Sequence, residues 1–161
     1  MALQGCLKIG GRTYGVVSCD YSFSQPVDAF GKPNARPAGG KITFTIPSTT
    51  DEDMFFYNWM FHKTEAKSGI LQFCLYSHEN KRVYKTVSFV NAFCIGLHDV
   101  FNNNNQMLML TTITISAQLI RVGMLNASTF VNSWTTAPVA TLVANVGEHI
   151  RDSIAEKINP F

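Results

Sequence analysis

The residues that could carry acid–base chemistry are few in this chain. His98 and Asp99 form an adjacent imidazole–carboxylate pair within a strand-like run. Adjacent side chains of a β-strand point to opposite faces, so the pair makes a poor catalytic dyad. The four histidines show no metal-ligand spacing with one another or with cysteine. The sequence therefore predicts no catalytic histidine and no metal site.

The thiols offer the second route to chemistry. The four cysteines, Cys6, Cys19, Cys74 and Cys94, are scattered without a CxxC motif. Three of them, Cys6, Cys74 and Cys94, lie in strand-like runs. None sits at a helix start, where its pKa would be lowered. We therefore expect thiols packed as small apolar side chains in a reducing compartment. A cysteine-dependent hydrolase stays as an alternative, and it predicts one highly reactive thiol.

A glycine-rich run suggests phosphate binding but lacks the full motif. Gly39, Gly40 and Lys41 resemble the end of a phosphate-binding loop, yet Ala35 and Ile42 stand where that loop needs glycine and Ser or Thr. We interpret the run as turn chemistry. The net charge of +2 gives no argument for nucleic acid as a partner.

The elements that would position any site are mostly strands. Residues 107–121 alternate between a largely apolar set and a set whose middle is Thr112, Thr114 and Ser116. This pattern predicts a long strand with one dry face and one hydroxyl-rich face, typical of an antiparallel sheet. Similar patterns predict strands at residues 2–9, 13–18 with an extension through Phe23, 41–46, 70–77, 83–90 and 92–101, with a possible bulge at Gly96.

One helix is predicted between these strands, at residues 54–61. Thr49 or Thr50 would cap it, and the acidic residues 51–53 would occupy its first turn, which suits the helix dipole. Its body has one polar residue, Asn58, so it lacks a wet face. A small barrel covers only one side of a helix, and we expect a neighbouring subunit to cover the other. The predicted interface residues are Phe55, Phe56, Tyr57 and Trp59. Burial of the helix wholly within one domain is the alternative.

Residues 28–40 form a long loop rich in glycine and proline. Loops of this length in compact domains are usually functional or disordered. Three of its residues are predicted to contact a neighbouring subunit: Asp28, Lys32 and Arg36. A solvated turn is the alternative.

Charged residues make up 15% of the chain, against about 25% in ordinary soluble domains. So little charge leaves apolar or uncharged surface outside, and a partner that covers it is the simplest explanation. No apolar run approaches the length of a membrane span, and residues 1–17 lack an apolar run of signal-peptide length. We therefore predict no membrane insertion.

The composition changes after Trp134. Apolar residues then recur at helical spacing at Val139, Leu142, Val143, Val146, Ile150, Ile154 and Ile158. Gly147 weakens this predicted helix, so it needs a surface to pack on. We expect two parts: a barrel at residues 1–134 and a C-terminal extension, with an extra helix, at residues 135–161.

Several short motifs occur in the order of a known family. They are Cys19-Asp20-Tyr21-Ser22, Val27-Asp28-Ala29, Gly31-Lys32-Pro33, Gly39-Gly40, Trp59-Met60, Phe89, Asn91-Ala92 and Thr114-Ile115-Ser116-Ala117. Together they resemble Hcp (TssD), the haemolysin-coregulated tube proteins of type VI secretion systems, and most of all the subtype iii branch. The resemblance covers residues 1–134, and members of that branch end near Trp134.

The resemblance implies an all-β (mainly β) subunit, a two-sheet antiparallel β-barrel with one flanking helix. Six such subunits form a ring, and rings stack into a hollow tube that a contractile sheath ejects. The implied partners are other copies of the chain, a VgrG-type spike, the sheath and secreted effectors. No catalysis and no cofactor are implied. Assembly would be cytoplasmic, followed by export through the type VI apparatus without a signal peptide.

Two other functions stay open at this stage. A tail-tube protein of a phage-like contractile particle would use the same architecture. A monomeric β-barrel that binds a small apolar ligand would need a roomy apolar interior and would stay monomeric in solution.

Overall fold

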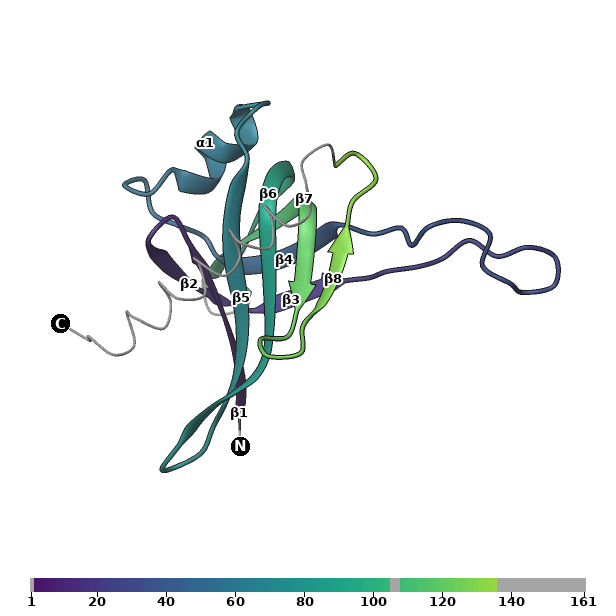
Figure 1. The fold of residues 1–161 in the computed structure, drawn as a ribbon. Coiled ribbons are helices and arrows are strands. Elements are labelled where there is room, and N and C mark those ends of the chain that lie inside the picture. The colour runs from purple at the N-terminus through teal and green to yellow at the C-terminus, as the bar shows by residue number, and fades with distance from the viewer. Residues whose placement is uncertain (1, 105–107, 136–161) are drawn as a thin grey trace.

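The computed structural model describes residues 2–104 and 108–135, and within them it shows a curled antiparallel sheet with one flanking helix (Figure 1). This confirms the mainly-β barrel class; the predicted C-terminal helix lies outside the described residues. The elements are β1 (Ala2–Ile9), β2 (Arg12–Val16), β3 (Ser18–Tyr21), β4 (Lys41–Pro47), α1 (Phe55–Phe61), β5 (Lys67–Tyr76), β6 (Lys81–Asn102), β7 (Leu108–Val122) and β8 (Ser128–Val131).

The strands form one strongly curled sheet. Their order is β2-β1-β5-β6-β7-β4-β3, and β8 pairs with β7 beside this path. The strand predicted at residues 13–18, with its extension through Phe23, is divided in two by a bend at Val17, where the chain passes directly from β2 to β3. The Val17 N–H donates to the Thr45 carbonyl at 2.8 Å. The two outer strands of the sheet are therefore consecutive parts of one segment, which draws the sheet into a barrel.

The predicted dry face of the long strand is confirmed in β7. Its residues Thr111, Ile113, Ile115 and Ala117 are at most 2% exposed, while the hydroxyl residues between them are half-buried. Large side chains from the other strands meet them and fill the barrel interior, each fully buried one contributing about 1.5–3 kcal/mol. They include Leu7, Ile42, Phe44, Ile46, Leu71 and Phe89.

The two strands predicted at residues 83–90 and 92–101 are a single strand, β6. It pairs with β5 along its first half and with β7 along its second half. Asn91, with φ 50°, shifts the alternation, so that Phe89 and Ala92 both face the core. The predicted bulge is confirmed, because the register shifts between Cys94 and Gly96. The interruption in the sequence pattern therefore marks the point where the side chains of β6 change face, and the strand itself continues.

The predicted cap of the helix is wrong. The helix α1 begins at Phe55, with Met54 at the N-cap position and no side-chain cap, and its first turn holds no acidic residue. Thr49 instead donates its hydroxyl to the Asp53 carbonyl at 2.7 Å. The Asp53 carboxylate binds Arg12 of β2 and the Phe55 N–H. The Asp53 carboxylate, which was predicted to lie in the first turn of the helix, therefore binds β2 instead.

Candidate assembly surfaces

The segment between β3 and β4, residues 22–40, is a long hairpin that projects from the barrel; we call it the arm (Figure 1). Ser24 and Ala38 exchange backbone hydrogen bonds of 3.0 and 2.7 Å across it. Val27 and Pro33 form a second bridge nearer the tip. The loop predicted at residues 28–40 is therefore the outer and returning part of a paired structure.

The tip of the arm is shaped by Asp28. Its carboxylate accepts hydrogen bonds from the Phe30 N–H at 2.9 Å and the Lys32 N–H at 3.0 Å. Gly31 has φ 82°, a left-handed conformation that glycine adopts without strain. This turn leaves the Phe30 side chain 96% exposed. The tip is therefore an ordered turn that presents an aromatic ring to the outside.

The base of the arm is fixed to the barrel. The rings of Phe23 and Phe130 lie 5.1 Å apart, so the arm packs on β8. On the returning side, the Gly40 carbonyl accepts a hydrogen bond of 2.8 Å from the Ala117 N–H. Gly40 itself has φ 95°, and a Cβ there would lie 2.3 Å from the Asn132 amide. Any other residue at this position would be strained by the positive φ and would displace the Asn132 amide.

The two predicted basic residues of the arm, Lys32 and Arg36, are exposed. Within the described part of the chain neither forms an ion pair. Phe30 was missed by the sequence reasoning. Its only signal in the sequence is that it is an aromatic residue in a polar loop, and the prediction for this loop rested on the charged residues.

The four helix residues predicted at an interface divide into two pairs. Phe56 and Trp59 are at most 1% exposed and belong to the core of their own subunit. Phe55 and Tyr57 are half-buried. The Lys67 ammonium lies 4.8 Å from the centroid of the Phe55 ring and covers part of it. Only Phe55 and Tyr57 of the predicted set keep surface for a neighbour.

Tyr57 also holds α1 to the barrel. Its hydroxyl donates to Asp99 at 2.6 Å, and this hydrogen bond, with burial, raises the pKa of Tyr57. The outward side of the helix is apolar where Phe61 and Met54 lie, 78% and 38% exposed. The surface that α1 offers to a partner is therefore centred on Phe61 and Met54, beside the residues first predicted.

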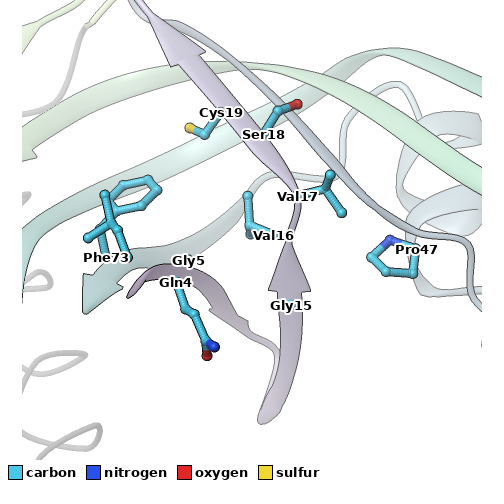
Figure 2. A pocket seen from close by; sticks show the side chains of 10 residues that line it. Gln4, Gly5, Gly15, Val16, Val17, Ser18, Cys19, Pro47 and Phe73 are labelled. Atoms are coloured by element: carbon cyan, nitrogen blue, oxygen red, sulfur yellow. The ribbon is translucent and has the colours of Figure 1, made fainter. Parts of the chain in front are cut away.

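A groove of about 470 Å³ lies where β1 and β3 diverge (Figure 2). Strand β2 pairs with β1 only as far as Gly5, so residues 2–4 lack a strand partner on that side among the described strands. β3 likewise pairs only with β4 there. Phe73, Val16 and Cys19 form the floor because they also pack against the core. The groove therefore combines an apolar floor with free backbone edges.

The groups considered for catalysis have structural positions. Asp99 binds Tyr57, whereas His98 is exposed and pairs with Thr112 in the sheet. Burial raises the pKa of Cys19 and of Cys94 to about 11, so these two thiols are protonated near neutral pH. Among the residues that the structure describes, no group of three potential metal ligands occurs. None of the described helices is long and apolar enough to cross a membrane.

The fold defines a class of protein: a curled antiparallel β-barrel with a flanking helix and a projecting arm. Solved structures share this fold. Hcp1 from Flavobacterium johnsoniae matches with a TM-score of 0.69 and 26% identity over 80% of this chain and 99% of that one. Hcp1 from Salmonella typhimurium matches with a TM-score of 0.61 and 13% identity over 80% of this chain and 93% of that one. Hcp3 from Pseudomonas aeruginosa matches with a TM-score of 0.58 and 10% identity over 84% of this chain and 100% of that one.

The family model of Hemolysin coregulated protein Hcp (TssD) matches residues 1–135. The chain therefore belongs to the Hcp (TssD) family and is a tube subunit of a type VI secretion system. A comparison with curated protein sequences gives no match. Assignment to the subtype iii branch stays a prediction.

Proposed function

We propose that the chain assembles into hexameric rings that stack, through the arm, into the inner tube of a type VI secretion system. The observation that carries this proposal is the arm: a hydrogen-bonded hairpin with a fixed base and an exposed aromatic tip, on a chain of a tube-forming family. Because the hairpin projects beyond its own barrel, its tip is placed to contact another copy of the chain. The number six comes from the family resemblance.

Ring closure would use the two surfaces at the sides of the barrel. The free edges of the groove between β1 and β3 suit addition of a strand or extended segment from a neighbouring subunit. Such pairing also protects exposed strand edges, which otherwise aggregate. The outward side of α1, with Phe61 and Met54, supplies an apolar contact for the same neighbour or the one on the opposite side.

Stacking would use the tip of the arm. Phe30 supplies apolar area for a contact with the next ring, and Lys32 and Arg36 supply charges that bring an acidic patch into register. Asp28 has a different role from the one predicted. It contributes to stacking by holding the turn that presents Phe30.

The lumen wall would be the hydroxyl face of β4 and β7. Across these strands the hydroxyls of Thr45 and Thr112 lie 2.9 Å apart, and those of Thr43 and Thr114 lie 3.2 Å apart. A hydroxyl surface without fixed charge wets readily and favours no single cargo. The subunit would act without catalysis or a cofactor, assemble in the cytoplasm, and be exported with effectors and a VgrG-type spike by a contractile sheath.

The barrel interior disfavours the ligand-binding alternative. Phe44, Leu71, Ile113 and Ile115 meet inside the barrel and are fully buried, so side chains occupy the space that a ligand would need. The groove of Figure 2 is an open surface feature at the strand edges.

The experiment replaces both basic residues of the arm, with Lys32→Glu and Arg36→Glu in one chain. Ring mass should be unchanged, because neither residue contacts the barrel, while tube formation and type VI export should be lost. In the single variant Lys32→Glu, the extent of stacking should vary with salt concentration, because salt screens exposed charges. The matched control is Lys85→Glu, which makes a similar charge change on β6, away from the arm. Normal tubes and export from the double variant would refute the role of the arm.

A further inference from the structure

The tip of the arm and the groove of Figure 2 lie at opposite ends of one two-stranded ribbon. Strands β3 and β4 pair with each other, and the arm continues them outward from the barrel (Figure 1). Phe30 stands at the outer end of this ribbon. At the other end, Val17, Ser18 and Pro47 line the groove. The ribbon therefore carries an exposed aromatic ring at one end and an apolar hollow at the other.

The groove has the chemistry of a site for an apolar side chain. None of its ten lining residues is charged, and Val16, Cys19 and Phe73 form its floor. Leu3 and Val17, which also line it, are 54% and 60% exposed. An aromatic side chain that enters such a hollow buries about 150–250 Å². With a volume of about 470 Å³, the groove has room for one ring and for the backbone that carries it.

The charges beside the two ends of the ribbon are complementary. Lys32 and Arg36 follow Phe30 in the arm and are exposed. Asp20 follows Cys19 of the groove floor and is exposed as well; none of these three charged residues forms an ion pair within the described part of the chain. Opposite charges on two surfaces bring them into register as they associate. The tip of one copy therefore matches the groove of another in both apolar surface and charge.

The separation of the two ends favours an open stack over a closed ring. Phe30 lies 13 residues after Val17, which is at most about 43 Å in an extended chain. Because the tip and the groove are different surfaces, a contact between them is head-to-tail. Each copy then keeps a free tip or a free groove for a further copy. A contact of this kind, directed along the ribbon, adds subunits one after another in the direction of the arm.

We propose that the arm tip of one subunit docks in the groove between β1 and β3 of a subunit in the next ring, with Phe30 on the floor formed by Val16, Cys19 and Phe73. This inference rests on the proposed function of the chain as a stacking tube subunit. It assigns the groove to stacking in place of ring closure, which then falls to the outward side of α1.

Two introduced cysteines test this contact in the full chain. Ala29→Cys lies beside Phe30 and keeps its ring, and Ser18→Cys lies at the groove; both positions are exposed. The two positions are about 36 Å apart along an extended chain, so a disulfide between them joins two copies. Tubes of this double variant, checked by electron microscopy, are oxidised with copper phenanthroline and denatured without reductant. The disulfide should link copies into a ladder that continues beyond six, and peptide mass spectrometry should identify the joined peptides.

Three controls separate this contact from other thiol reactions. Each single-cysteine variant keeps the native thiols and should give no ladder. The chain with Ala29→Cys and Leu125→Cys has its second thiol at a 96% exposed position away from the groove, and it should give none either. Adding Phe30→Ser to the chain with Ala29→Cys and Ser18→Cys should lower the disulfide yield at least tenfold, because the ring that holds the tip in the groove is lost.

The outcomes distinguish this inference from the proposed function. Tubes that give no disulfide between positions 29 and 18, or the same yield with Leu125→Cys, overturn the inference and leave the tube standing. A ladder that ends at six copies also overturns it, because the tip then lies in the groove of a ring neighbour. Failure of the unchanged chain to stack overturns the inference and the proposed stacking together. If only the Ser18→Cys chain fails to stack, Gln4→Cys on the β1 side of the groove replaces it, and the same outcomes decide.

Discussion

At the scale of single residues, Asp53 connects two parts of the barrel. Arg12 and the Tyr14 hydroxyl of β2 donate to its carboxylate, the latter at 2.8 Å, and the Phe55 N–H donates at 3.1 Å. Burial alone would raise the pKa of Asp53. The hydrogen bonds from Tyr14 and Phe55, with the charge of Arg12, outweigh burial and lower the pKa of Asp53 below its ordinary value of 3.8.

The lowered pKa predicts an acid-sensitive contribution to stability. A carboxyl group with a depressed folded pKa stabilises the fold above the unfolded value, and the contribution is lost as pH falls from 3.8 through the folded pKa. Asp53→Asn should lower the free energy of unfolding at pH 7 by about 1–3 kcal/mol. It should also flatten the pH dependence below pH 4. Chemical denaturation at several pH values measures both, with the exposed Asp51→Asn as control. Parallel pH curves for Asp53→Asn and the unchanged chain would contradict this account.

Single residues also show where the sequence was insufficient. Asp28 was predicted to contact a neighbour, but its carboxylate folds the tip of its own arm. Phe56 and Trp59 were predicted at an interface, and they lie in the core. Spacing predicts which residues share a face, but which face meets the barrel depends on the direction in which a helix docks, and that is set by contacts distant in sequence.

At the scale of elements, α1 has one face for the core and another for the outside. An aspartate placed on the core face buries an unpaired charge, which costs several kcal/mol. Phe56→Asp should therefore abolish the fold. Phe61→Asp changes a side chain that is 78% exposed, so it should leave the melting temperature within a few degrees and still weaken ring formation.

Circular dichroism melting and sizing by light scattering compare these two helix variants. Asn58→Asp is the matched control, because it adds the same charge at an exposed polar position of α1. Loss of folding in Phe61→Asp, or normal rings in it at micromolar concentration, would show that this side of the helix is not an interface.

The arm predicts a second result at this scale. Phe30→Ser removes an exposed ring and leaves the backbone turn of Asp28 unchanged, so the single ring should form normally. Stacking should weaken without the salt dependence expected for Lys32 and Arg36, because the lost contact is apolar. Tube length in electron micrographs at low and high salt measures this. Leu125→Ser, in the turn between β7 and β8, gives the comparison at a 96% exposed apolar position away from the arm.

The elements themselves were largely predictable. β1 and the dry face of β7 follow from alternation alone. The turn that joins β1 to β2 uses Gly10 and Gly11, with φ angles of 58° and 73° that glycine adopts without strain. The strand β6 was divided in two because Asn91 and the bulge shift its alternation. The arm was read as a loop because its pairing consists of isolated bridges without a hydrophobic period.

At the scale of the whole molecule, three features have one explanation. The low charged fraction, the apolar outer side of α1 and the open groove between β1 and β3 all leave surface that a solitary barrel would expose. Family membership supplies the partner, since the copies of a tube protein cover one another. The filled barrel interior is a property of the single subunit, whereas we propose that the groove, α1 and the arm contribute to the assembly.

The mass of the assembled particle at micromolar concentration tests the central claim most directly. Native mass spectrometry of the full chain should show a closed ring of six copies of 17.9 kDa, a particle of about 107 kDa. The Phe61→Asp chain, measured in the same run, should shift toward smaller species. A folded particle of 17.9 kDa as the sole species at that concentration would contradict the account of this chain as a ring-building tube subunit.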